Sequence, residues 1–213
     1  MNRGYSMQAE SWVGTIKKLS CVKRFSQTEM AKPENVLDHT AMVALICSHI
    51  GASLMDNDGV YVDMGMLLQR ALLHDIEESE IGDVARPAKY SSEVVRDSFA
   101  TLEHQTAQKI FKDANVQGFK HIWMRAKAQD FEGLIVKYAD ALSAVVKFHD
   151  EIYVRGNMSM VDLMAVGLFD NLDNLLTDIA KHTGLQSSKT AIEYYKLNNV
   201  MQYQIARRVE QCS

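Results

Sequence analysis

The sequence predicts an all-α protein that folds as a single domain over residues 1–213, and three observations support this. Hydrophobic residues make up 47% of the chain and charged residues 23%, proportions typical of a globular chain that buries a core. The only two prolines are Pro33 and Pro87, whereas the turns of β-sandwiches and barrels depend heavily on proline and glycine. Apolar residues recur at steps of three and four, the period of a helix with one buried face.

The first helix is expected from Met7 to Val22, with one buried apolar stripe along it. The stripe consists of Ala9, Trp12, Val13, Ile16, Leu19 and Val22. A loop follows as far as Pro33, because the residue before a proline avoids helical backbone angles. This loop carries polar groups beside Arg24 and Phe25 and is therefore a candidate for functional contacts.

A second helix is expected from about Val36 to Leu54, ended by the turn at residues 56–59. Its expected buried residues are Ala41, Met42, Leu45, Ile46 and Ile50. Asp63 suits the N-cap of a third helix, which leads into a polar patch at residues 74–78. Residues 60–62 briefly resemble a strand but are too few to start a sheet.

Five more helices are expected in the C-terminal half, at about residues 91–113, 118–129, 131–154, 159–184 and 189–209. Ser91-Ser92 supplies the N-cap of the first of these. Gly156 fits a C-terminal cap, and Ser159 with Asp162 fits the spacing of a capping box. The sequence assigns no role to the helices within residues 157–213.

Charge and cysteine content exclude several classes of protein. A formal net charge of −4 gives no general attraction to nucleic acid, so no nucleic-acid polymer is expected as a partner. Cys21, Cys47 and Cys212 form no CxxC pair, which argues against a disulfide framework or zinc knuckle and suits a reducing cytoplasm. No apolar run reaches the ~18 residues of a membrane span and no signal peptide is evident, so no membrane association is expected.

Four polar side chains interrupt the most apolar helices. His39 lies in the second expected helix, His74-Asp75 closes the third, and Asp140 lies between two alanines of a later one. Buried charge is costly unless it is paired or binds a metal. Two imidazoles and two carboxylates from three helices can converge inside a bundle, and they suit a first-row divalent metal. Each of these residues taken alone is more often an ordinary core or surface residue.

The segments around these residues resemble a known family. They are Val22-Lys23-Arg24-Phe25, Glu34-Asn35-Val36-Leu37-Asp38-His39, Leu73-His74-Asp75-Ile76-Glu77-Glu78, Gly82-Asp83, Pro87-Ala88-Lys89-Tyr90 and Lys137-Tyr138-Ala139-Asp140-Ala141-Leu142. Together they resemble the HD-domain phosphohydrolases, in particular the small bacterial 5'-deoxynucleotidases and related deoxynucleoside triphosphate triphosphohydrolases. The resemblance covers about residues 15–155 and implies an HD-type helical bundle with extra C-terminal helices.

The resemblance implies a role for each matching residue. His39, His74, Asp75 and Asp140 match the metal ligands of the family. The implied cofactor is one divalent transition metal, namely Co, Mn, Zn, Ni or Fe, with Mg also possible. Glu78 matches the carboxylate that orients or deprotonates the attacking water.

Other matches imply contacts with the substrate. Arg24 matches the arginine that orients the phosphate, and Asp83 matches the residue that reads the sugar 3'-hydroxyl; with Glu78 they form the implied catalytic set. Phe25 stands where the deoxynucleotidases carry tryptophan beside the sugar and base, which implies a different pocket. The remaining implied substrate contacts are Val84, Ala85, Arg86 and Lys89, the last of them on the phosphate side.

The chemistry of phosphate ester hydrolysis agrees with these roles. Glu78 follows His74 by four residues, a spacing that places both on one face of a helix. Arg24 offers a planar fork of donors for phosphate oxygens. Glu77 and Glu80 point elsewhere on such a helix and are expected in solvent. The histidines expected to be ordinary core or surface residues are His49, His104, His121, His149 and His182.

We therefore expect a metal-dependent phosphohydrolase that converts deoxynucleoside 5'-monophosphates to deoxynucleosides and phosphate. The alternative within the resemblance is a deoxynucleoside triphosphate triphosphohydrolase, acting for example on dATP and releasing tripolyphosphate. An alternative of another class is a catalytically weak nucleotide-sensing module. By family analogy we expect a homo-oligomer, in the cytoplasm of a bacterium or, if the gene is viral, of a host cell.

Overall fold

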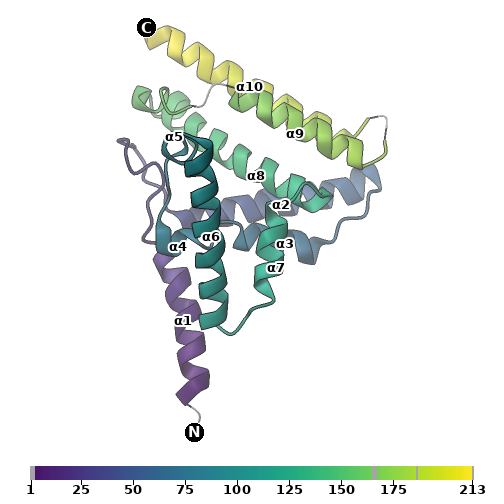
Figure 1. Cartoon of the computed structure of the whole chain (residues 1–213). Coiled ribbons are helices and arrows are strands. Elements are labelled where there is room, and N and C mark those ends of the chain that lie inside the picture. Colours follow the sequence, from purple (N-terminus) through teal and green to yellow (C-terminus); the bar gives the residue numbers. More distant parts are fainter. Residues whose placement is uncertain (1–2, 165–166, 186, 213) are drawn as a thin grey trace.

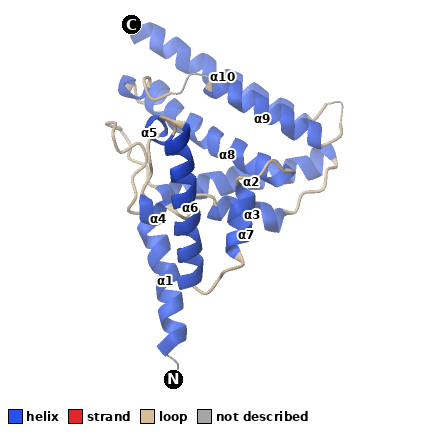
Figure 2. Ribbon diagram, in the orientation of Figure 1, coloured by secondary structure: helices blue, strands red, loops and turns tan. Residues whose placement is uncertain are grey.

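Every regular element in the computed structural model is a helix (Figures 1 and 2). The structure describes residues 3–164, 167–185 and 187–212. Its elements are α1 (Arg3–Leu19), α2 (Val36–Asp58), α3 (Met64–Leu73), α4 (Glu78–Ile81), α5 (Arg86–Lys89), α6 (Glu93–Asp113), α7 (Phe119–Ala126), α8 (Phe131–Phe148), the π-helical segment η1 (His149–Val154), the 3₁₀ turn η2 (Met158–Met160), α9 (Leu168–His182) and α10 (Lys189–Cys212). Within the described ranges no strand forms, residues 60–62 included, so the predicted all-α fold class is confirmed.

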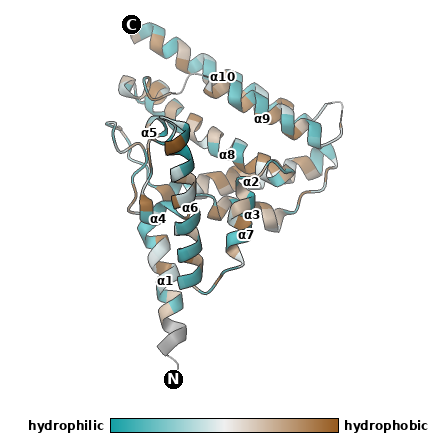
Figure 3. Ribbon diagram, viewed as in Figure 1, coloured by the Kyte–Doolittle hydropathy of each residue, from teal (hydrophilic) through white to brown (hydrophobic). Residues whose placement is uncertain are grey.

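The main hydrophobic core lies where α2, α3 and α8 pack together. These helices carry long apolar stretches, which Figure 3 shows in brown. Helices α9 and α10 run side by side and cover one side of this core, with α10 also packed against η1 (Figure 1). Helices α1 and α6 also lie side by side and project away from the centre (Figure 1). A second cluster of buried residues, including Leu19, Phe111 and Trp123, joins them to α7.

Polar side chains fix where the central helices begin. Asp63 and Ser92 cap α3 and α6, as predicted from the sequence. Asn35 caps α2 in the same way, because its side-chain oxygen accepts from the backbone N–H of Asp38 at 2.9 Å. Asp130 caps α8. Each cap satisfies a backbone donor that the first helical turn leaves without a partner.

The predicted buried stripe of the first helix is wrong in part. Leu19 is buried and Trp12 and Val22 are half-buried, as predicted. Ala9, Val13 and Ile16 are exposed, Val13 by 63%. Helix α1 lies at the edge of the molecule and packs mainly against α4 and α6. Only one side near its C-terminal end is therefore covered, and the helical period alone does not reveal how much of a stripe a neighbour covers.

The predicted buried face of α2 is also wrong in part. Ala41 is exposed, Met42 is 43% exposed and Leu45 is 69% exposed, while Ile46 is half-buried and Ile50 is buried as expected. The covered face instead carries Val36, His39, Thr40, Val43, Cys47 and Leu54. Helix α2 is long and apolar enough by length and composition to cross a membrane, and in this fold it packs against α3 and α8. A helix that is apolar on all sides does not indicate which side is buried.

Several helix boundaries differ from the sequence predictions. Helix α1 covers Arg3–Leu19 instead of Met7–Val22, and α2 continues to Asp58, through most of the turn predicted to end it. Two later helices differ more. The helix expected from residue 131 to 154 is α-helical only to Phe148, and its last six residues form the π-helical η1. The helix expected from residue 159 begins at Leu168, after Gly167 with a φ of +79°. Ser159 does not cap a helix there, because its hydroxyl donates to the backbone carbonyl of Glu29. Residues 165 and 166 of that predicted helix lie outside the described residues.

Candidate metal centre

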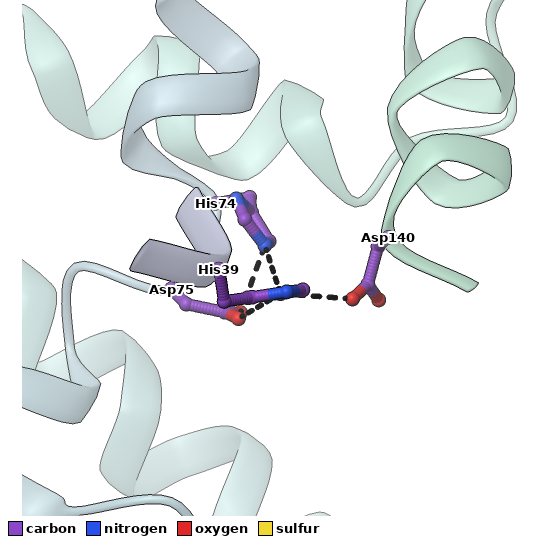
Figure 4. A group of neighbouring side chains, drawn as sticks. All are labelled: His39, His74, Asp75 and Asp140. Atoms are coloured by element: carbon purple, nitrogen blue, oxygen red, sulfur yellow. Dashed lines mark hydrogen bonds and ion pairs between the residues drawn. The ribbon is translucent and has the colours of Figure 1, made fainter. Parts of the chain in front are cut away.

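Four side chains from three parts of the bundle converge on one point (Figure 4). His39 comes from α2, His74 and Asp75 follow the end of α3, and Asp140 comes from α8. One ligand atom of each lies within 4.8 Å of the other three. His39 Nε2 lies 3.1 Å from Asp140 Oδ1 and 3.3 Å from His74 Nε2. The structure thus brings together all four residues that the sequence analysis assigned to a metal site.

Burial and charge strongly perturb these groups. Burial alone would lower the pKa of His74, but the charges of Asp75 and Asp140 and hydrogen bonding outweigh it and raise this pKa to about 9. Burial would raise the pKa of Asp75, yet the neighbouring His74 and His39 hold it well below its usual value. His74 Nε2 lies 3.0 Å from Asp75 Oδ2. This close set of two nitrogens and two carboxylates needs positive charge at its centre.

The donor set fits a divalent transition metal. Imidazole nitrogens and carboxylate oxygens are ligands that first-row divalent ions accept together. His74 is already oriented as a ligand, because its Nδ1 donates to the backbone carbonyl of Ala71 at 2.6 Å. That bond places the proton of the neutral ring on Nδ1 and leaves the Nε2 lone pair facing the cluster.

Helix-to-helix ion pairs hold the elements that carry the cluster. Arg70 is almost fully buried near the end of α3 and donates to Asp130 Oδ1 at 2.5 Å. Arg125 donates to the other oxygen of Asp130 at 2.6 Å. Because Asp130 is also the N-cap of α8, these bonds fix the start of the helix that carries Asp140 relative to α3.

Arg24 lies beside the cluster. Its Nη1 donates to Glu34 Oε1 at 2.6 Å and approaches His39 Nδ1 at 2.8 Å. The next residue, Phe25, has a left-handed backbone with φ of +52°. Its backbone N–H donates to Asp83 Oδ2 at 3.0 Å. The predicted phosphate and sugar contacts, Arg24 and Asp83, are therefore neighbours in space although 59 residues separate them in the chain.

Glu78 lies close to the same group of charges. Burial and the carboxylates of Asp75, Asp83 and Glu77 raise the pKa of Glu78 to about 10, against a lowering effect from Arg24. The sequence analysis placed Glu78 on one continuous helix with His74, whereas α3 ends at Leu73 and α4 begins at Glu78. The turn between the two helices, not a shared helical face, brings the Glu78 carboxylate to the cluster.

The expectation that Glu77 lies in solvent is wrong. Its side chain is buried and accepts from Trp123 Nε1 at 2.7 Å and from Lys127 Nζ at 2.5 Å. Glu77 therefore ties the turn after His74-Asp75 to α7. Glu80 is exposed, as expected, and pairs with Lys18 on the surface. The local sequence does not indicate that Glu77 is buried while Glu80 is exposed. The partners that bury Glu77 lie about 50 positions away in the chain.

The remaining predicted substrate contacts lie on the segment after Asp83. Val84 and Ala85 are half-buried and Arg86 is exposed. Lys89 forms an ion pair with Glu103 of α6. Its charge is thus already engaged within the protein. The other histidines lie outside the cluster; His49, for example, bonds the hydroxyl of Tyr194.

Two residues near the site were missed by the sequence analysis. The buried Ser143 places its hydroxyl 3.0 Å from His39 Nδ1. Glu151, fully buried in η1, accepts from the backbone N–H groups of Ala31 and Lys32 at 2.8 and 2.9 Å and so holds the loop that follows Phe25. The only available signal was spacing, since Ser143 follows Asp140 by three residues on the same helix.

Comparison with known proteins agrees with the geometry of this centre. The family model described as 5'-deoxynucleotidase YfbR-like matches residues 11–174. A 5'-deoxynucleotidase of Klebsiella pneumoniae is 25% identical over 154 residues, which cover 71% of this chain and 77% of the relative. The 5'-deoxynucleotidase YfbR of Escherichia coli is 24% identical over 155 residues, with the same coverage.

Solved structures show the same fold at lower sequence identity. An HD-domain phosphohydrolase from Listeria innocua superposes with a TM-score of 0.71 at 21% identity and covers 95% of this chain and 92% of its own. The cyanophage S-2L HD phosphohydrolase, solved bound to dA and one catalytic Zn²⁺ ion, has a TM-score of 0.56 at 17% identity, covering 92% and 95%. The HD-domain phosphohydrolase of Listeria innocua thus shares the fold of this chain. The family match spans most of the chain, so this protein belongs to the 5'-deoxynucleotidase YfbR-like family.

Proposed function

We propose that the protein hydrolyses 2'-deoxynucleoside 5'-monophosphates to deoxynucleosides and phosphate. The observation that carries this proposal is the convergence of Arg24, Asp83 and Glu78 around the four-residue cluster. One cation for the phosphate, one acceptor for a sugar hydroxyl and one carboxylate for a water are the groups that this reaction requires. The family to which the chain belongs supports the substrate class.

The proposed cofactor is one divalent transition metal held by His39, His74, Asp75 and Asp140. The donor atoms and their mutual distances fit such an ion, and the catalytic Zn²⁺ ion bound to the cyanophage relative supports the assignment. When bound, a metal of this kind acidifies a water molecule and polarises a phosphoryl oxygen.

The residues of the chain perform the remaining work. Glu78, whose raised pKa a divalent cation beside Asp75 would bring down so that the carboxylate is ionised, accepts a proton from the attacking water, whose oxygen bonds to phosphorus as the bond from phosphorus to the sugar O5' breaks. The departing O5' takes up a proton and leaves as the hydroxyl of the deoxynucleoside. Arg24 holds nonbridging phosphate oxygens and offsets their growing charge. Asp83 has one oxygen bonded to Phe25 N–H, and its other oxygen accepts from the sugar 3'-hydroxyl.

The ion pair between Lys89 and Glu103 supports monophosphates over triphosphates. A tripolyphosphate chain carries several negative charges beyond the reacting phosphorus and calls for additional cations. Lys89, which the sequence analysis placed on the phosphate side, is already paired with Glu103. Glu103 also lies 3.3 Å from Lys127, so releasing Lys89 to a substrate would disturb a connected network.

A panel of nucleotides tests the proposed function. The purified protein is assayed with deoxynucleoside mono- and triphosphates and ribonucleoside monophosphates, each with Co²⁺, Mn²⁺, Mg²⁺ or Zn²⁺, and orthophosphate and tripolyphosphate are both quantified. We expect orthophosphate from deoxynucleoside monophosphates. Tripolyphosphate as the main product would establish the triphosphohydrolase alternative. Tight nucleotide binding without turnover under any condition would establish the sensing module.

A further inference from the structure

His39 Nδ1 faces two different partners. Arg24 Nη1 lies 2.8 Å from this nitrogen and Ser143 Oγ lies 3.0 Å from it. The ring is buried, with a residue exposure of 1%, so no solvent replaces either contact. On the other side of the ring, Nε2 lies 3.1 Å from Asp140 Oδ1.

The contact with Arg24 determines which nitrogen carries the proton of the neutral ring. A guanidinium has only donors, so Arg24 donates to His39 Nδ1, and Nδ1 must present its lone pair. The proton then lies on Nε2, from where it is donated to Asp140.

A metal ligand needs the opposite arrangement. For Nε2 to offer its lone pair to a cation, the proton must lie on Nδ1 and must be accepted there by an oxygen. His74 has the required acceptor for its Nδ1 proton in the carbonyl of Ala71. Among the described residues, Arg24 and Ser143 are the hydrogen-bond partners of His39 Nδ1, and of these two the Ser143 hydroxyl can accept whereas Arg24 cannot.

We propose that Arg24 and Ser143 compete for His39 Nδ1, so that a divalent cation at the cluster shifts Nδ1 to Ser143 and frees the Arg24 guanidinium for the substrate phosphate. The bond from Arg24 to Glu34 at 2.6 Å persists and keeps the freed side chain beside the cluster. Ser143 is a positioning residue in this scheme, because it acts through His39. The phosphate part rests on the proposed function, whereas the competition at Nδ1 does not.

Cation titration of four proteins tests the competition without any substrate. Chelator-treated wild type, Ser143→Ala, Arg24→Met and the double variant are titrated with Co²⁺, followed by its visible absorption. Loss of the acceptor is expected to weaken Co²⁺ binding ~10–100-fold in Ser143→Ala, the range for a lost outer partner of a ligand. Arg24→Met is expected to strengthen binding, and by a larger factor in the Ser143→Ala background than in the wild type.

The proposal is tested by comparing the effect of Arg24→Met on Co²⁺ affinity in the wild type with its effect in the Ser143→Ala protein. Removal of the positive charge of Arg24 strengthens cation binding by the same factor in both backgrounds. This electrostatic contribution therefore cancels when the two effects are compared. Ser53→Ala is the matched control, because Ser53 is also a buried serine but lies on α2, ~21 Å along that helix from His39. It should leave Co²⁺ affinity unchanged. Equal effects of Arg24→Met in both backgrounds, or wild-type affinity in Ser143→Ala, would overturn the proposal.

The ¹⁵N chemical shifts of the His39 ring provide a second measurement. We expect the ring proton on Nε2 in the chelated protein and on Nδ1 in the protein loaded with Zn²⁺. A proton on Nδ1 in both states would overturn the competition even if Ser143→Ala fails to fold. Neither experiment uses a nucleotide. Their outcomes therefore do not depend on whether the protein hydrolyses deoxynucleoside monophosphates.

Discussion

Three acidic residues close together in the chain, Glu77, Glu78 and Glu80, have three different environments. Glu77 is buried against Trp123 and Lys127. Glu78 lies among the charges of the cluster, and Glu80 is on the surface. Their chemistry is identical, so their roles depend on what the fold places next to each carboxylate.

Substituting Glu78→Gln tests its role as the base. The amide keeps the size of the side chain but cannot accept the proton of the attacking water. We expect turnover of deoxynucleoside monophosphates to fall ~10²–10⁴-fold, with Co²⁺ and nucleotide binding retained. Steady-state kinetics and Co²⁺ titration measure both quantities. Glu80→Gln serves as the matched control and should retain wild-type turnover; a fully active Glu78→Gln protein would contradict the assignment.

The raised pKa of His74 predicts how cation binding depends on pH. With a pKa of about 9, the ring of the chelated protein is protonated at neutral pH, and a cation must displace that proton. Affinity for Co²⁺ should therefore rise with pH, ~10-fold per unit for one exchanged proton, until about pH 9. Titrations between pH 6.5 and 8.5 measure the slope. A flat profile would show that His74 is not a ligand.

Residue identities in the candidate site were predictable to a limited extent. The positions of His39, His74, Asp75 and Asp140 followed from their place in apolar helices and from the family resemblance, and the structure brings them together. Ser143 was not predicted, because its spacing of three residues from Asp140 on one helix does not reveal its distance to a histidine ring of another helix. Its role depends on a contact between residues 104 positions apart.

At the scale of elements, the π-helical segment η1 anchors the loop that follows Phe25. Glu151 is the anchor: it accepts from two backbone N–H groups of that loop, from Asn157 at 2.7 Å and from Lys147 at 2.6 Å. Burial would raise the pKa of Glu151, but these bonds lower it to about 2. The Glu151 carboxylate therefore holds the loop beside Arg24, together with the bonds that Asn157 and Ser159 donate to the backbone carbonyl of Glu29.

Replacing Glu151→Gln should lower the free energy of unfolding by ~3 kcal/mol at pH 7, because Lys147 is left buried without its partner. Since the folded pKa lies below the ordinary value of 4.5, this contribution is complete above about pH 4.5 and is lost as pH falls toward 2. The difference between wild type and variant, from urea unfolding, should shrink over that range. Asp150→Asn, with a partly exposed ion pair, should change stability by less than ~1 kcal/mol.

The presence of the helices was predicted more accurately than which side of each helix is buried. Ser92 and Asp63 were identified as caps because a side-chain oxygen before an apolar run has a local physical meaning. The buried face of α2 was not identified, since Leu45 and Cys47 are equally apolar in sequence and only the packing of α3 and α8 distinguishes them. The η1 segment was missed because nothing in residues 149–154 departs from ordinary helical spacing.

At the scale of the whole molecule, α2 connects the candidate site with the C-terminal helices. His39 lies near its start, and Asp58 at its end accepts from the Ser188 hydroxyl and the backbone N–H groups of Lys189 and Thr190. Asp58 thus caps α10 from a distant part of the chain. The family match covers residues 11–174, so Asp58 lies within the matched region while the helix that it caps, α10, lies beyond it.

Substituting Asp58→Ala should lower the free energy of unfolding by ~1–2 kcal/mol, the usual cost of a lost N-cap. Asp56→Ala is the matched control, because Asp56 is exposed near the same end of α2, and it should change stability by less than ~0.5 kcal/mol. Thermal and urea unfolding measure both. Equal stability of the two variants would show that α10 does not depend on this cap.

The left-handed backbone of Phe25 has one more consequence. A non-glycine residue in this conformation costs ~1–2 kcal/mol, and here the bond to Asp83 and the contact of the Phe25 ring with Phe148, 5.5 Å between centroids, hold it in place. This cost is met when the chain folds. For the proposed nucleotide substrate, Phe25 would then be a preorganised wall, and binding would cost less conformational entropy than it would at a loop that had to be ordered first.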